Sequence, residues 1–499
     1  MKILMVYPGY PDTFWSFRHA LKFISKKAAF PPLGLLTVAS LLPEAWEKKL
    51  VDMNTDTLSV RDIQWADYVF ISAMTIQRES AKDVIARCRK EGTPVVAGGP
   101  LFTAEYEKFE GVDHFVLNEA ELTLPAFLED LGNGCARHLY TSSNFPDITG
   151  TPIPAWELVD MSKYSSMCIQ YSRGCPFDCE FCSIVAMNGH VPRTKDTEQL
   201  LAEMEALYRA GWRSNVFIVD DNFIGNKKKL KGSVLPALAA WLQLKRHPFA
   251  FTTEASINIS DDDELIRLMV QADFTTVFVG IETTSDESLA ECGKFQNKGR
   301  DMVTAVQKLH RSGLQVQAGF IVGFDNDGVS VFENIISFIQ ETGIVTAMVG
   351  LLNAPSDTRL YRRLKKEGRI LADMSGDNTD WSMNFTPKMD RNQLIDGYHR
   401  IINTIYSNNS YYERVRTFLS QYEPGRAAGI ELKPRESVQA LFKAFWILGI
   451  RERGRRNYWK LLAGTALKRP RLLPLSITLA IYGYHFRKVI AGYGAAASR

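Results

Sequence analysis

The sequence predicts an α/β protein in three parts: a doubly wound parallel sheet, a partial (β/α)6 barrel and a mainly α C-terminal domain. Strand and helix patterns alternate over the first 130 residues and again from residue 163 to residue 360. A stretch with three prolines and little periodicity separates the two series, and helical patterns dominate after residue 360. We therefore expect domains at 1–142, 163–360 and 361–499, with a linker at 143–162.

The first series begins with the apolar runs "KILMVYP", "DYVFISAM" and "PVVAGGP", which predict buried strands. The stretches "PPLGLLTVASLLPEAW" and "ESAKDVIARCRKEG" between them have helical length and spacing. Alternation of this kind predicts a Rossmann-like sheet, in which ligands bind beyond the carboxyl ends of the strands. The candidate ligand-binding residues at those ends are Tyr7, Ser72, Met74, Gly98, Gly99 and Glu119.

The second series contains six strand patterns with helical crossovers between them. The strands are "SMCIQYSRG", "SNVFIVDDNF", "FAFTTEAS", "TVFVGIET", "QVQAGFIVGF" and "VTAMVGLLNA". Six such units predict a partial barrel, whose active site is expected at the carboxyl ends of its strands.

Composition narrows the class of protein. The chain has 499 residues, of which 45% are hydrophobic and 23% charged, as in globular proteins with ordinary cores. Its seven cysteines are an odd number and do not form a disulfide framework, so we expect a reducing cytoplasm. The N-terminal "MKILMVYPGY" lacks the longer apolar region of a signal peptide, and export is not expected.

The C-terminal tail is strongly basic. Residues 451–499 contain eleven lysines and arginines and one acidic residue, a net charge of +10, together with the apolar run "LLPLSITLAIYGYHF". That run has about 15 residues, fewer than the roughly 20 that span a bilayer. Two interpretations stay open: a solvated basic helical tail, or a tail that rests on an anionic membrane surface or binds an acidic partner.

The most specific signal is the stretch "YSRGCPFDCEFCS", which places Cys175, Cys179 and Cys182 on a loop after the first barrel strand. A structural zinc site needs four protein ligands, so three thiolates alone do not complete it. A [4Fe–4S] cluster held by three thiolates keeps one iron without a protein ligand. The spacing therefore favours such a cluster with an open iron.

Two other interpretations of these cysteines stay open. One is a zinc site with a remote fourth ligand, such as Cys168 or His190. The other is three unrelated core cysteines, which Gly174 and Pro176 in the same loop argue against.

The residues "CPFDCEFC" resemble the signature of the radical S-adenosylmethionine (radical SAM) superfamily. The resemblance implies that the open iron binds the amino and carboxylate groups of SAM, and that a 5′-deoxyadenosyl radical abstracts hydrogen from the substrate. Each SAM-binding residue that it implies also has an ordinary structural interpretation, such as helix capping or a contact inside the barrel. These residues are Phe181, Asp220, Asn222, Glu254, Glu282, Gly319 and Gly323.

A doubly wound domain directly before a radical barrel resembles the cobalamin-binding radical SAM subfamily, in a subgroup with its own helical C-terminal domain. The resemblance assigns the six strand-end residues of the first sheet to cobalamin: Tyr7, Ser72, Met74, Gly98, Gly99 and Glu119. No Asp-x-His-x-x-Gly motif is present, so this assignment depends on architecture and names no lower axial ligand of cobalt.

Together these cofactors imply methylation of an unactivated carbon. An enzyme that cyclises, rearranges or oxidises its substrate without methyl transfer is the alternative, and a zinc-dependent binding module is a weaker one. Methylthiolation would require three more cysteines in the first domain, where only Cys88 and Cys135 lie. The expected partners are a small-molecule, lipid or peptide substrate and an external electron donor such as flavodoxin or ferredoxin, without nucleic acid.

Overall fold

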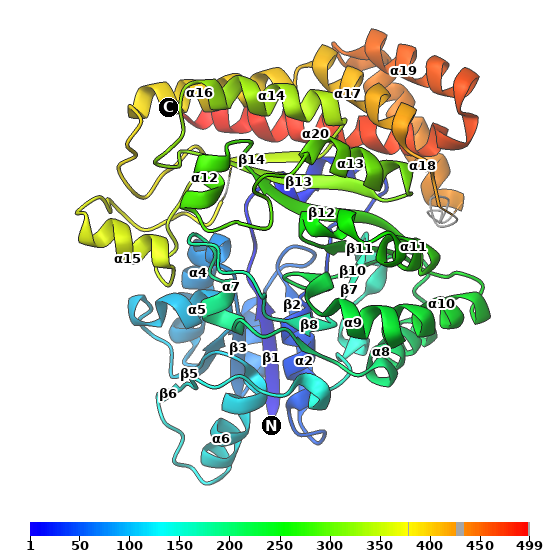
Figure 1. The fold of residues 1–499 in the computed structure, drawn as a ribbon. Helices are drawn as coiled ribbons and strands as arrows, with labels where there is room; N and C mark the ends of the chain where they lie inside the picture. The colour runs from blue at the N-terminus through cyan, green and yellow to red at the C-terminus, as the bar shows by residue number, and fades with distance from the viewer. Residues whose placement is uncertain (378, 426–433, 498–499) are drawn as a thin grey trace.

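Two six-stranded parallel sheets and a layer of C-terminal helices make up the molecule (Figure 1). In the computed structural model, residues 1–377, 379–425 and 434–497 are described. The predicted fold class is confirmed. The exact domain boundaries stay a prediction, because no break in the architecture tests them.

The first sheet has the strand order β2-β1-β3-β4-β5-β6, which is a doubly wound order. Its central strand β1 has Ile3, Leu4, Met5 and Val6 fully buried, because helices cover both faces of the sheet. The strands are β1 (Lys2–Tyr7), β2 (Glu47–Asp52), β3 (Tyr68–Ser72), β4 (Val95–Gly98), β5 (His114–Val116) and β6 (Leu139–Tyr140). The helices are α2 (Leu33–Leu41), α3 (Val60–Trp65), α4 (Arg78–Glu91), α5 (Pro100–Glu105) and α6 (Ala120–Gly132).

The second sheet has the order β14-β13-β12-β11-β10-β7, with neighbours in chain order as in an open barrel. Its strands are β7 (Met167–Ile169), β10 (Asn215–Ile218), β11 (Ala250–Glu254), β12 (Phe274–Glu282), β13 (Gln315–Val322) and β14 (Ala347–Leu351). Its outer helices are α8 (Thr197–Arg209), α10 (Leu235–Leu244), α11 (Asp263–Gln271), α13 (Met302–Arg311) and α14 (Ser330–Thr342).

Side chains on the two faces of the barrel sheet differ in burial. Residues that face the outer helices, such as Val277, Val279 and Val316, are fully buried. The alternate residues face the barrel axis and remain only half-buried, among them Phe217, Thr252, Glu254, Phe278, Gln317, Ile321 and Met348. The inner wall of the barrel is therefore not filled by the chain's own core.

A segment of the first domain reaches this inner wall. In η1 (Phe14–Ser16), the Trp15 ring meets Phe278 edge-on with centroids 5.4 Å apart, and its Nε1 donates to the sulfur of Met348 at 2.9 Å. The first domain thus contributes an aromatic side chain to the barrel interior.

The C-terminal helices lie across the barrel, along the upper edge of Figure 1. Helix α20 packs on η1 and α1 (Arg18–Leu21), where Phe486 stacks on Phe14 with centroids 4.2 Å apart. The apolar run predicted in the tail is therefore mostly internal: Leu479 and Phe486 are buried. The elements are α15 (Arg359–Lys366), α16 (Arg391–Ile405), α17 (Asn408–Gln421), α18 (Pro434–Trp446), η11 (Ile447–Arg451), α19 (Arg455–Lys468) and α20 (Leu473–Ala497).

Candidate functional site

The cysteine loop starts at a turn that only glycine fits. Gly174 follows the short strand β8 (Ser172–Arg173) and has a φ of +95°. A Cβ there would lie 2.9 Å from the carbonyl oxygens of both Asn188 and Gly189. The turn therefore directs the chain from β8 into the cysteines, and the loop closes at α7 (Ile184–Asn188).

Asp220 fixes the start of this loop. Its carboxylate accepts hydrogen bonds from the backbone amides of Tyr171 and Ser172, both at 2.8 Å, and from the Ser172 hydroxyl at 2.6 Å. Burial raises the pKa of Asp220 to about 7. Because its oxygens are already bonded within the protein, Asp220 positions the loop, and its predicted contact with SAM stays a prediction.

The three cysteines fit a cluster better than a single metal ion. Cys175, Cys179 and Cys182 are free and half-buried, and burial raises the pKa of Cys182 to about 12. Among the described residues, their sulfurs do not form a group within 4.8 Å of one another. Tetrahedral zinc would hold thiolates about 3.8 Å apart, given a Zn–S bond near 2.3 Å. A multi-iron cluster spaces its thiolates more widely and supplies the positive charge that buried thiolates need.

Glu254 ends strand β11 at the same end of the barrel. No hydrogen-bond partner for its side chain is found within the described part of the chain. Burial, together with the nearby Asp221 and Asp220, raises the pKa of Glu254 to about 8. An unpaired carboxylate in this setting is stabilised by a cationic ligand, which suits the predicted contact with the amino group of SAM.

Glu282 ends strand β12 and forms an ion pair with Lys294, a residue that sequence reasoning missed. Burial alone would lower the pKa of Lys294, but Glu282 and Cys179 raise it above its ordinary value. Gly280 makes room for the pair, because a Cβ there would lie 2.3 Å from Glu282 Oε1. The only sequence signal for Lys294 is its place in the polar segment "ECGKFQNKG" after the strand.

The remaining predicted SAM-site residues lie around the same barrel end. Asn222 accepts from the Ser256 amide at 3.1 Å, and Phe181 packs beside Phe324. Gly323 has a φ of +106°, and a Cβ on Gly319 would lie 3.1 Å from the Phe278 ring. The structure thus gathers these positions at one end of the barrel, while their individual contacts with SAM stay predictions.

The carboxyl ends of β1, β3 and β4 form a cradle at the edge of the first sheet. A Cβ on Gly98 would lie 2.6 Å from the Val116 carbonyl, and one on Gly99 would lie 2.3 Å from Ser72 Oγ. Burial, with Asp52 nearby, raises the pKa of Tyr7. Met74 beside them is 42% exposed. The close contacts show that the protein's own packing requires glycine at positions 98 and 99. Both positions lie at the carboxyl edge of the sheet, where ligands of doubly wound sheets bind, and the assignment of these residues to cobalamin stays a prediction.

Glu119, also predicted at this edge, has a bridging role that the sequence did not reveal. Its carboxylate pairs with Arg173 at 2.6 Å and with Arg193 at 2.6 Å, and Arg173 also pairs with Glu121 at 2.8 Å. Both arginines flank the cysteine loop, on β8 and on β9 (Arg193–Thr194). Glu119 therefore joins the first sheet to the cysteine loop, and its contact with cobalamin stays a prediction.

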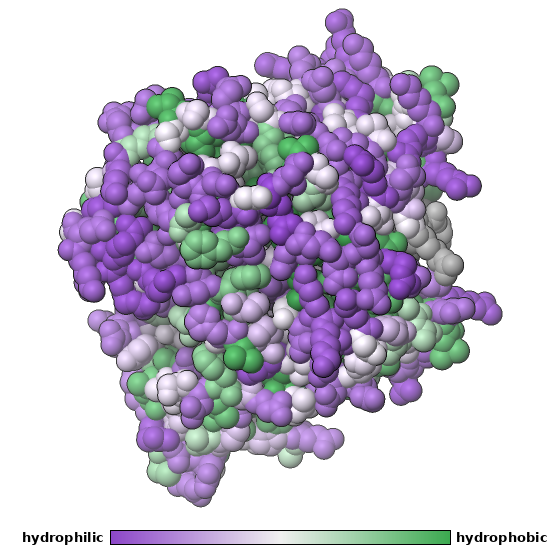
Figure 2. All heavy atoms as spheres, viewed as in Figure 1, coloured by the Kyte–Doolittle hydropathy of each residue, from purple (hydrophilic) through white to green (hydrophobic). Residues whose placement is uncertain are grey.

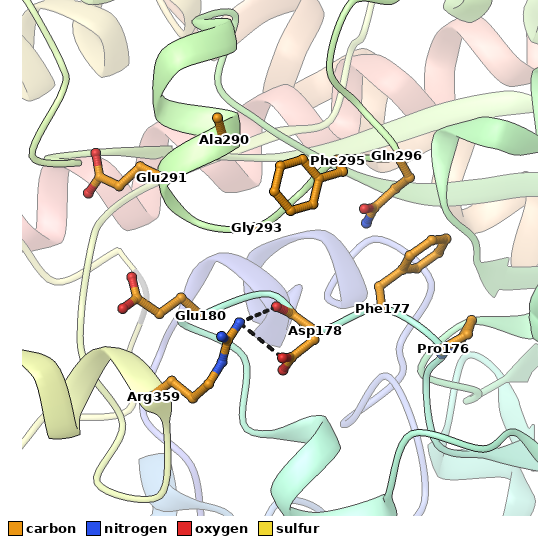
Figure 3. Close-up of a pocket in the computed structure, with 10 residues that line it drawn as sticks. All are labelled: Pro176, Phe177, Asp178, Glu180, Ala290, Glu291, Gly293, Phe295, Gln296 and Arg359. Atoms are coloured by element: carbon orange, nitrogen blue, oxygen red, sulfur yellow. Dashed lines mark hydrogen bonds and ion pairs between the residues drawn. The ribbon is translucent and has the colours of Figure 1, made fainter.

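A cavity of about 700 Å³ lies beside the cysteine loop (Figure 3). Phe177 and Asp178 of the loop face Phe295 and Gln296 across it, and Arg359 of α15 bonds to Asp178. None of the predicted ligand-binding residues lines this cavity. It is therefore a separate hollow next to the cysteines.

Three family models match the chain in the order of its architecture. They are the B12 binding domain at residues 24–128, the Radical SAM superfamily at residues 169–339 and a domain of unknown function (DUF4070) at residues 358–496. The fold and the three-cysteine loop thus define a radical SAM enzyme with a B12-binding domain.

Relatives extend over nearly the whole chain. An uncharacterized methyltransferase of Synechocystis is 39% identical over 97% of this chain and 91% of its own length. The hopanoid C-2 methylase of Rhodopseudomonas palustris is 32% identical over 92% of this chain and 88% of its own. The protein belongs to this family of cobalamin-binding radical SAM enzymes. Its cofactors are a [4Fe–4S] cluster, SAM and cobalamin.

Two solved structures share the fold at low sequence identity. The radical enzyme OxsB with aqua-cobalamin bound superposes with a TM-score of 0.64 at 13% identity, covering 98% of this chain and 80% of its own. The Kitasatospora setae methyltransferase TsrM with cobalamin and a [4Fe–4S] cluster has a TM-score of 0.60 at 12% identity, covering 93% and 99%. These similarities confirm the predicted architecture.

Proposed function

We propose that this enzyme methylates an unactivated carbon of an apolar small molecule. One observation carries the proposal: the three-cysteine loop and Glu254, which has no hydrogen-bond partner among the described residues, lie at the same end of the barrel. Below them, the side chains of the barrel's inner wall are only half-buried. Relatives that match most of the chain are named as methyltransferases, which favours methyl transfer over cyclisation or rearrangement.

When bound, the cluster and SAM supply a hydrogen-abstracting radical, and cobalamin supplies a methyl group. The balance for a substrate R–H is two SAM and two electrons, giving R–CH3, S-adenosylhomocysteine, methionine and 5′-deoxyadenosine. The C–H bond breaks, a C–C bond forms, and the hydrogen leaves in 5′-deoxyadenosine. The electrons come from an external donor.

The chain's own residues bind and orient the reactants. Glu254 holds the amino group of SAM through a charge-assisted hydrogen bond. Glu119, with Arg173 and Arg193, fixes the first sheet against the cysteine loop, and this contact would hold the sites for cobalamin and for the cluster with SAM in a constant relation. This alignment matters because the substrate must meet both groups without leaving the barrel.

The inner wall indicates the substrate class. Phe217, Phe278, Ile321 and Met348 present apolar surface toward the barrel axis, and Trp15 completes it from the first domain. A rigid polycyclic lipid would bury such a surface without charged partners. The likeness to a hopanoid methylase supports this class.

We further propose that an acidic carrier such as flavodoxin or ferredoxin delivers the electrons on the α15 side of the cysteine loop. Arg359 binds the backbone of Asp178 in the loop at 2.5 Å, and Arg363 binds Glu180 at 2.8 Å. Arg362, Lys365 and Lys366 of the same helix are exposed. Cations at this position would steer an acidic carrier toward the cluster.

The test is anaerobic reconstitution with iron, sulfide, cobalamin, a chemical reductant and methyl-labelled SAM, with a polycyclic hydrocarbon lipid as substrate. We expect labelled methylated lipid, with S-adenosylhomocysteine and 5′-deoxyadenosine formed alongside it. Cys179→Ala should lose the cluster and both SAM-derived products. The exposed Cys135→Ala is the matched control and should retain them.

A product without the labelled methyl group would refute methylation and support the cyclising or oxidising alternative. Formation of 5′-deoxyadenosine by Cys179→Ala would refute the cluster assignment itself.

A further inference from the structure

Helix α18 carries a stripe of large apolar side chains that the described residues of the chain do not cover. Phe442 is 71% exposed and Trp446 is 56% exposed. Their positions recur every three or four residues, so they lie along one side of the helix. We call this stripe the α18 face: Val438, Leu441, Phe442, Phe445, Trp446 and, in the following turn, Ile450.

The opposite side of α18 is already packed against the protein. Ala444 and Leu448 are fully buried there. Lys443 donates from Nζ to the Lys22 carbonyl at 2.7 Å and to Ser25 Oγ at 3.1 Å. Ala444 and Lys443 hold this side of the helix against the protein, so the large rings of the α18 face point away from the core.

Cations follow the α18 face along the chain. Trp459 of α19 extends it, since its ring meets Phe445 edge-on at 5.6 Å. The next residues along the chain form an exposed basic rim: Arg451, Arg453, Arg455, Arg456 and Lys460. Figure 2 shows that the surface over the C-terminal helices, along the upper edge, is mostly hydrophilic, with a few apolar side chains among the polar ones.

We propose that the α18 face docks on an anionic lipid bilayer, with its rings at the boundary between headgroups and acyl chains and the basic rim against lipid phosphates. Exposed apolar patches of this kind are uncommon on monomeric proteins. An amphipathic helix with tryptophans and arginines at its edges is typical of interfacial binding. No described helix is long and apolar enough to cross a membrane, so the contact is peripheral.

A second copy of the chain fits this face less well. Self-association would bring the basic rim of one copy against that of another, and Glu452 is the one acidic residue between Ile450 and Arg471. Anionic lipids supply the negative charge that would balance the cations of the rim.

The location of the α18 face deepens the proposed function. Helix α18 contacts residues 22–25, which continue from the segment that carries Trp15 to the inner wall of the barrel. A lipid substrate drawn from the bilayer would therefore enter beside this segment. That step rests on the proposed function, whereas membrane docking itself does not.

Sedimentation of the full-length reconstituted protein with phosphatidylglycerol vesicles tests the docking. We expect binding to these vesicles and weak binding to phosphatidylcholine vesicles. The double variant Phe442→Gln/Trp446→Gln should bind at least about tenfold less, because two large apolar side chains no longer enter the bilayer. Arg455→Gln/Arg456→Gln should lose about as much on the anionic vesicles alone.

Leu244→Gln is the matched control, because Leu244 is 77% exposed on α10 and lies outside the α18 face. It should bind vesicles as the unmodified chain does. All variants should keep their thermal midpoint and their 5′-deoxyadenosine formation in detergent, which separates docking from catalysis. The proposal would be overturned if Phe442→Gln/Trp446→Gln bound the anionic vesicles as tightly as the unmodified chain. It would also be overturned if the unmodified chain self-associated and only Phe442→Gln/Trp446→Gln abolished that self-association.

Discussion

At the residue scale, Glu254 shows how burial prepares a binding group. The protein removes this carboxylate from water and places Asp221 nearby, which raises its pKa to about 8, but provides no hydrogen-bond partner among the described residues. Such a carboxyl group gains most from a cation that arrives with the ligand. Glu282, by contrast, already has Lys294.

We predict that Glu254→Gln weakens SAM binding by roughly 10- to 100-fold, which corresponds to one lost charge-assisted hydrogen bond. Iron and sulfide content should be unchanged, because Glu254 does not bind the cysteines. Anaerobic equilibrium dialysis with labelled SAM measures the effect. Glu287→Gln, at an exposed position on α12 (Asp286–Glu291), is the control; an equal loss in both variants would contradict the assignment.

At the element scale, the turn between β4 and α5 forms part of the predicted cobalamin site. Gly99 has a φ of +86° and lies so close to Ser72 that a side chain would overlap its hydroxyl. We predict that Gly99→Ala lowers retained cobalamin at least about tenfold, through steric overlap with Ser72 and through backbone strain of about 1–3 kcal/mol, because a φ of +86° with a ψ of −177° is almost confined to glycine. Absorbance after desalting measures the bound cobalamin.

Gly134→Ala is the control for an alanine at a positive φ without steric overlap. Gly134 also has a positive φ, of +69°, but nothing lies within 4 Å of its would-be Cβ. This variant should keep its cobalamin. If Gly99→Ala keeps it as well, the cradle is not the cobalamin site.

Elements with strong local signals were predictable from the sequence, and weakly marked ones were not. Helix α4 follows its pattern closely: Ala81, Val84 and Cys88 are buried, and Gly92 ends the helix. Strand β2 was missed because its sequence "EKKLVD" is charged and partly exposed at the edge of the sheet. Its register is set by pairing with β1, which is information the segment itself does not contain.

The candidate site divides in the same way. The spacing of Cys175, Cys179 and Cys182 predicts their role directly. The strand-end glycines are predictable because they follow apolar runs of strand length. The ion pairs of Glu119 with Arg193 and of Glu282 with Lys294 join residues that only the fold brings together. Such partnerships leave no local pattern in the sequence.

At the scale of the whole molecule, two buried histidines lie where the C-terminal helices meet the rest of the protein. His310 of α13 is fully buried against the Phe418 ring of α17, and burial lowers its pKa to about 4. His485 of α20 donates to the Phe14 carbonyl at 3.0 Å and has a pKa of about 4 for the same reason, with Asp12 and His19 nearby.

These histidines make the packing of the C-terminal layer sensitive to acid. Folding keeps both neutral, whereas an unfolded chain binds protons near pH 6.5. Their contribution to stability is therefore complete above pH 6.5 and is lost as the pH falls from 6.5 to about 4, on the order of 3 kcal/mol for each histidine. Asp220 and Glu254 act in the opposite direction, because burial raises their pKa values to about 7 and 8 and their contribution to stability is lost as the pH rises. We therefore expect the histidines to lower the thermal midpoint, relative to variants that lack them, as the pH falls through the window from 6.5 to about 4. His310→Leu should make that fall shallower, because the leucine stays apolar at every pH, while His190→Leu at an exposed position should not. Melting curves from pH 8 to pH 4 measure the slopes, and parallel slopes for the unmodified chain and His310→Leu would show that this interface does not govern acid unfolding.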